Sequence, residues 1–87
     1  MLDIKLSTIE ESGEELVVKQ HTYENDEDAK ELYDKLTEEY AEQSLPFFGK
    51  GEQLLKLEIL ETDSEDFITE CYFEYTEELK GHLYQRL

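Results

Sequence analysis

The sequence of 87 residues is poor in several residue types that characterise large protein classes. It has a single cysteine, Cys71, so no disulfide can form within the chain, which is typical of a reducing cytoplasm. It has no apolar run of about 18 residues for a membrane span and no basic, apolar leader for secretion. Lys and Arg are also scarce, whereas proteins that bind nucleic acid directly cluster them on one surface. We therefore expect a cytoplasmic protein that neither enters membranes nor binds nucleic acid itself.

Acidic residues are what the sequence has in excess. The chain has 24 Asp and Glu against 8 Lys and Arg, which gives a formal net charge of -16. High charge with low hydrophobicity is the signature of disorder, but 38% of the residues are hydrophobic and 11% are aromatic, which favours a folded core. Because 87 residues suffice for one domain only, we expect residues 1–87 to form a single acidic domain.

Two pairs of segments show the period of two that is typical of half-buried strands. In the first segment Leu2, Ile4 and Leu6 alternate with polar residues. The pattern predicts strands near residues 2–10, 15–23, 54–62 and 67–75, joined in pairs by the acidic turns at 10–15 and 62–66. The residues predicted to share the inner face of the last strand are Phe67, Thr69, Cys71, Phe73 and Tyr75.

Between the two hairpins the period changes to that of a helix near residues 26–43. Asn25 is a suitable N-cap, and the acidic residues after it favour the positive end of the helix dipole. Thr76 predicts the start of a short C-terminal helix with Leu79, Leu83 and Leu87 on one face. The expected fold class is α+β, with order β-β-α-β-β-(α) and the main helix packed on one face of a four-stranded antiparallel sheet. The apolar face of the main helix consists of Ala29, Leu32, Tyr33, Leu36 and Tyr40.

The opposite face of the predicted main helix carries a row of carboxylates, which we call the acidic ridge. The acidic ridge consists of Glu27, Glu31, Asp34, Glu38 and Glu42. Its members are spaced 4, 3, 4 and 4 residues apart, so it runs for about 22 Å along one side of the helix. Glu31 and Lys35 form a favourable i,i+4 pair, but Lys30 and Lys35 cannot neutralise five acids.

Other candidate contacts lie in the sheet and in one loop. Side chains that alternate with Cys71 and Phe73 point outward, and the second hairpin turn is acidic. The loop between the main helix and the third strand contains two adjacent aromatic residues, which either fold back as a lid on the sheet or form an exposed anchor. The further residues that we expect to contact a partner are Asp63, Glu65, Asp66, Glu70, Tyr72, Glu74, Phe47 and Phe48.

Signatures of catalysis and of metal binding are missing from the sequence. General acid-base chemistry needs a buried carboxyl with a shifted pKa, whereas these acids lie on predicted exposed faces. His21, Cys71 and His82 lie far apart in the sequence, and the acidic turns lack the spacing and the glycine of a calcium-binding EF-hand loop. We therefore expect no catalytic residues, no metal and no cofactor, and interpret Cys71 as a core residue.

In size, charge and placement of acids, the chain resembles the small acidic proteins with which phages and mobile elements disable host defences. Anti-CRISPR proteins, uracil-DNA-glycosylase inhibitors and anti-restriction proteins belong to this class. The resemblance implies a non-enzymatic inhibitor that imitates DNA. Such an inhibitor would occupy the basic DNA-binding surface of a nucleic-acid-binding partner, such as a CRISPR effector nuclease.

The alternative is a small cytoplasmic phage or bacterial accessory protein whose acids serve solubility. It would dock or self-associate through Phe47, Phe48 and the C-terminal leucines. Either protein could be a monomer or a small homo-oligomer.

Overall fold

The computed structural model describes residues 1–45 and 51–87, and Phe47 and Phe48 lie outside these ranges. The described residues fold as four antiparallel strands and two helices, which confirms the predicted α+β class and all four strands. The elements are β1 (Leu2–Ile9), β2 (Glu15–Tyr23), α1 (Asp26–Glu39), the 3-10 turn η1 (Ala41–Gln43), β3 (Leu54–Glu61), β4 (Phe67–Glu74) and α2 (Glu77–Arg86).

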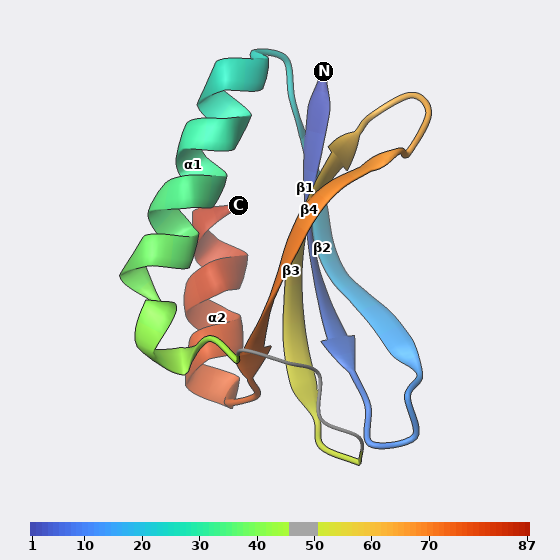
Figure 1. Ribbon diagram of the computed structural model, residues 1–87, viewed down its shortest axis with the longest axis vertical. Helices are drawn as coiled ribbons and strands as arrows, with labels where there is room; N and C mark the ends of the chain where they lie inside the picture. Colours follow the sequence, from blue (N-terminus) through green and yellow to red (C-terminus); the bar gives the residue numbers. More distant parts are fainter. Residues whose placement is uncertain (46–50) are drawn as a thin grey trace.

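The four strands form one sheet in the order β2-β1-β3-β4, so that the two hairpins meet through β1 and β3. In this central pair Leu2 lies opposite Glu61, and Ile9 lies opposite Leu54. Figure 1 shows α1 and α2 on the same side of the sheet, while both hairpin turns lie on the other side. We call the sheet face away from the helices the open face.

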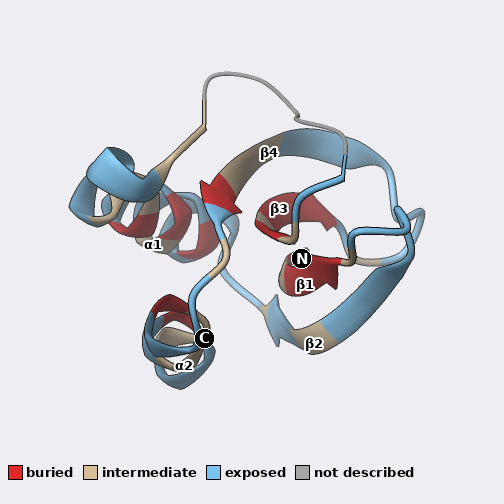
Figure 2. Cartoon of the chain, turned by 90° about the horizontal axis from the view of Figure 1, so that it is seen from below, coloured by how far each residue is buried: buried red, intermediate tan, exposed pale blue. Residues whose placement is uncertain are grey.

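The core lies between the helices and the inner face of the sheet. Figure 2 shows the buried segments of both helices turned toward the sheet, with β1 and β3 buried and much of β2 and β4 exposed. Leu36, Leu57, Ile59 and Phe73 belong to one buried cluster, and Leu32 packs against it. The apolar face predicted for the main helix therefore faces the core. The core residues of the cluster are Leu2, Ile4, Leu6, Ala29, Tyr33, Leu36, Leu55, Leu57, Ile59, Phe73, Leu79 and Leu83.

Both helices begin where the sequence predicts. The side chain of Asn25 accepts a hydrogen bond from the backbone N–H of Asp28 at 3.1 Å, and that of Thr76 accepts one from Leu79 at 3.0 Å. The end of α1 differs, because the α-helix stops at Glu39 and residues 41–43 form the 3-10 turn η1. Hydrogen bonds between residues three apart tighten this last turn and satisfy carbonyls that the end of a helix leaves free.

Strand β4 departs from the predicted alternation at its start. A β-bulge between Ile59 and Leu60 places Leu60 opposite Phe67, although Ile59 lies opposite Thr69. Phe67 therefore leaves the inner face that Phe73 occupies, and it is 58% exposed. One extra residue in β4 shifts the alternation, so the side chains before it point to the opposite face of the sheet. The prediction that Phe67 lies on the inner face was therefore wrong.

The C-terminal helix α2 packs on the same face of the sheet as α1. Leu79 and Leu83 are buried in the core, and Leu87 packs against it. Leu79 and Leu83 are therefore covered by the fold, whereas Leu87 stays partly exposed. Cys71 is half-buried against the same core, and burial raises the pKa of its thiol.

Candidate acidic interface

The acidic ridge is an exposed charged surface on the outer side of α1. Ala29, Tyr33 and Leu36 are buried against the sheet and fix the rotation of α1, so the ridge faces outward. All five carboxylates of the ridge are exposed, and Glu42 extends the row into η1. Helix α1 alone carries seven carboxylates and two lysines, with no basic residue in its last turn.

The lysines beside the ridge do not neutralise it. Lys30 and Lys35 line a shallow depression together with the four helical acids of the ridge. Among the described residues, however, no cation is within ion-pair distance of a ridge carboxylate. The expected pair between Glu31 and Lys35 is therefore not formed. Long side chains on an exposed helix gain little from such a contact and lose rotational freedom by making it.

The acidic residues of the second hairpin turn lie apart from the ridge. Asp63, Glu65 and Asp66 are exposed, but their turn projects from the far side of the sheet (Figure 1). A flat partner surface that contacts α1 therefore cannot reach them at the same time. The structure divides the predicted contact residues into two separate acidic surfaces.

The predicted contacts on β4 belong to the open face. Glu70 lies 3.5 Å from the ammonium of Lys56, and the hydroxyl of Tyr72 donates a hydrogen bond to Glu70 at 3.1 Å. Both side chains are half-buried, whereas Glu74 at the end of the strand is exposed. The charge of Glu70 is thus paired on the open face, so Glu70 contributes little to an unpaired acidic surface.

Glu70 is one member of a group of paired charges, which we call the open-face network. Its centre is Glu58, which is buried and lies 3.0 Å from Lys5 and 3.6 Å from Lys56. Lys56 also reaches Glu15 of the edge strand β2 at 3.2 Å. Burial alone would lower the pKa of Lys56, but the hydrogen bond to Glu15 and the nearby carboxylates raise it.

Asp3 is a second buried carboxylate on the open face. Its oxygens accept hydrogen bonds from Gln20 at 2.6 Å and from Thr22 and Thr62 at 2.7 Å each. Burial would raise the pKa of this carboxyl, but the three hydrogen bonds and the nearby His21 outweigh it and lower the pKa. Asp3 ties together three strands, because its partners lie on β2 and just beyond β3.

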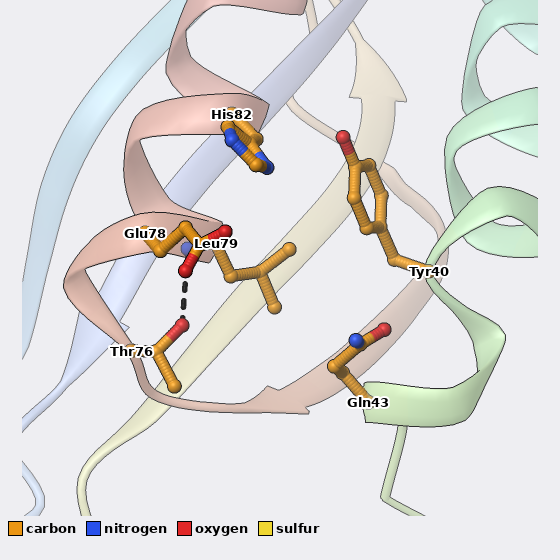
Figure 3. Close-up of a pocket in the computed structure, with 6 residues that line it drawn as sticks. All are labelled: Tyr40, Gln43, Thr76, Glu78, Leu79 and His82. Atoms are coloured by element: carbon orange, nitrogen blue, oxygen red, sulfur yellow. Dashed lines mark hydrogen bonds between the residues drawn. The ribbon is translucent and has the colours of Figure 1, made fainter.

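A cleft of about 340 Å³ between the end of α1 and the start of α2 was not predicted from the sequence. Figure 3 shows Tyr40 and His82 pointing from the two helices toward the gap. The cleft is lined by Tyr40, Gln43, Thr76, Glu78, Leu79 and His82.

No family model matches the chain, and no curated protein and no solved structure matches it either. Within residues 1–45 and 51–87, no group of His, Cys, Asp and Glu side chains is placed to hold a metal ion. In the same ranges neither helix is long and apolar enough to cross a membrane. The charged surfaces are therefore the features of the described residues that bear on function.

Proposed function

We propose that the chain is a non-enzymatic inhibitor that binds a basic, nucleic-acid-binding partner protein through its acidic ridge and so excludes the nucleic acid. The observation that carries the proposal is the row of five exposed carboxylates without an ion-pair partner among the described residues. From Glu27 to Glu38 the row extends for about 16 Å at the rise of an α-helix. Duplex DNA likewise presents closely spaced negative charges, which its binding proteins meet with clustered Lys and Arg.

The resemblance to phage-encoded inhibitors supports a finer version of the proposal. In that version the partner is a CRISPR effector nuclease in the host cytoplasm, and the ridge occupies its DNA-binding channel. Because the two acidic surfaces lie apart, only one of them makes the main contact with the partner. In this proposal it is the ridge of α1, and the second hairpin turn lies outside the contact.

The test compares two variants with the same change of charge. The ridge variant carries Glu31→Lys, Asp34→Lys and Glu38→Lys, and the turn variant carries Asp63→Lys, Glu65→Lys and Asp66→Lys. Proteins that wild type retains from a host lysate are identified by mass spectrometry, purified, and titrated with all three chains. We expect the ridge variant to lose about 100-fold or more in affinity and the turn variant to lose far less.

Two further measurements separate charge imitation from ordinary docking. Wild-type affinity should fall steeply between about 50 and about 200 mM salt, because charge attraction is screened. Duplex DNA, or the guide-loaded target of a nuclease, should displace the chain from the purified partner. Simultaneous binding of chain and DNA, or an unchanged affinity of the ridge variant, would contradict the proposal.

A further inference from the structure

We infer that the cleft between α1 and α2 binds the guanidinium group of an arginine side chain from the partner protein. The inference rests on the proposed function for the source of the arginine, since surfaces that bind phosphates present Arg and Lys. The cleft volume of about 340 Å³ lies near the lower end of the range for ligand pockets, about 300 to 1,000 Å³. One long side chain is therefore the appropriate size of occupant.

The lining of the cleft matches the chemistry of a guanidinium. Tyr40 and His82 form an aromatic wall, with ring centroids 6.3 Å apart and ring planes inclined by 33°. Leu79 supplies an apolar surface for the methylene groups of the arginine, and Figure 3 shows Glu78 and Gln43 at the sides of the same gap. A planar guanidinium stacks on aromatic rings and donates several hydrogen bonds at once, which the compact ammonium of lysine does not.

Two groups of the cleft have acceptor oxygens available. Among residues 1–45 and 51–87, no hydrogen bond or ion pair engages the carboxylate of Glu78 or the amide of Gln43. Both side chains are exposed, so an incoming donor reaches them without displacing an internal contact. Their oxygens favour a donor such as guanidinium over an anion.

The helix ends at the cleft also favour a cation. The negative end of the α1 dipole lies here, and no basic residue occupies the last turn of α1. The positive end of α2 forms the other wall, but its backbone N–H groups at Leu79 and Lys80 already donate to Thr76. The carboxylates of Glu77 and Glu78 in the first turn of α2 offset the remaining positive potential.

The chain itself already joins the same two helices with an arginine. Arg86 of α2 forms an ion pair with Glu39 of α1, and the carboxylate keeps the pKa of the guanidinium raised. Arg86 follows His82 by four residues, which is about one helical turn. An arginine in the cleft would lie nearer the start of α2, with Glu78 of that helix as the carboxylate.

The probe for the cleft is N-acetyl-arginine amide, titrated into the full-length, ¹⁵N-labelled chain and followed by NMR. We expect the largest shifts at Gln43, Thr76, Glu78 and His82, and binding of the arginine amide at least about threefold tighter than that of N-acetyl-lysine amide. Inorganic phosphate serves as the anionic probe. Larger shifts with phosphate at the same residues would overturn the inference, because they would define an anion site.

Two variants with the same loss of charge show whether the cleft is specific. Glu78→Gln removes the carboxylate of the cleft and should weaken binding of the arginine amide about fivefold or more. Glu61→Gln removes an exposed carboxylate at the end of β3, outside the cleft lining, and should leave binding unchanged. An equal effect of both variants, or shifts spread over the acidic ridge, would mean that only net charge attracts the arginine.

The two proposals can fail separately. If the arginine amide does not bind in the cleft but the ridge variant loses its partner, only the cleft assignment is wrong. If the arginine amide binds in the cleft and the ridge variant still binds its partner, the proposed function is wrong and the cleft remains a guanidinium site.

Discussion

The acidic ridge and the open-face network contain the same chemical groups in opposite situations. Every carboxylate of the ridge is exposed, and none forms an ion pair with a described residue. On the open face, Glu58 is 7% exposed and Asp3 is 5% exposed, and each has cations or hydrogen-bond donors around it. The acids of the open-face network and Asp3 are thus paired and buried or half-buried, whereas those of the ridge are unpaired and exposed.

This difference separates the carboxylates that maintain the fold from those available for recognition. A buried charge without a partner strongly destabilises a protein, so the open face has to supply Lys5, Lys56 and the donors around Asp3. An exposed row of like charges costs only a few tenths of a kcal/mol per i,i+4 pair. The ridge therefore lowers the free energy of unfolding only slightly, although it contributes no ion pair to the described fold.

The largest loss of stability should follow from a substitution on the buried face of α1, the helix that carries the ridge. Leu36→Ala removes a fully buried side chain and should lower the free energy of unfolding by about 2 to 5 kcal/mol. Urea denaturation followed by circular dichroism measures it. A loss below about 1 kcal/mol would mean that α1 packs by another face, and the exposure of the ridge would then be in doubt.

The next effect compares one aspartate from each region. Asp3→Ala removes the acceptor of three hydrogen bonds and should cost about 2 to 3 kcal/mol. Asp34→Ala is the same substitution on the ridge and should change the free energy of unfolding by no more than about 0.5 kcal/mol. Equal losses in the two denaturation curves would contradict the division into paired and unpaired acids.

A smaller effect is expected from pH on the stability that Asp3 contributes. Because its folded-state pKa is lowered, the ionised Asp3 stabilises the fold above the ordinary aspartate pKa of about 3.9. This contribution is lost as the pH falls through the folded-state pKa. The difference in unfolding free energy between wild type and Asp3→Asn should therefore shrink below about pH 4. A constant difference from about pH 6 to about pH 2 would show that the charge of Asp3 does not matter.

The smallest effect should be a gain in stability on the ridge. Glu31→Lys replaces repulsion from Glu27 and Asp34 by attraction, which is worth a few tenths of a kcal/mol at low salt. In about 1 M sodium chloride the gain should disappear, since exposed charges are then screened. If Glu31→Lys is clearly less stable than wild type at low salt, the side chain of Glu31 forms a stabilising contact and is not an unpaired member of the ridge.

The positions of the helices and strands could be predicted from the sequence because period and capping residues are local signals. Asn25, Thr76 and the alternation around Ile4 each act within a few residues of themselves. The ridge was predictable for the same reason, because the burial of Ala29 and Leu36 determines which side of α1 faces solvent.

The pairing on the open face depends on information that no local pattern contains. Lys5 meets Glu58 only because β1 lies between β2 and β3, and the strand order did not follow from the sequence. The bulge near Leu60 likewise depends on tertiary packing and reversed the expectation for Phe67. The cleft could not be predicted because Tyr40, at the end of α1, and His82, within α2, are far apart in the sequence and share no motif.

The central position of β1 has a consequence for the order of folding. During synthesis β1 and β2 can pair across a short turn as soon as they emerge, and β3 and β4 can do the same later. The β1–β3 pairing instead joins residues as far apart as Leu2 and Glu61, so it has to close a long loop. Each hairpin alone is marginal, so the chain should gain most of its cooperativity in the single late step in which the two hairpins zip together along β1 and β3.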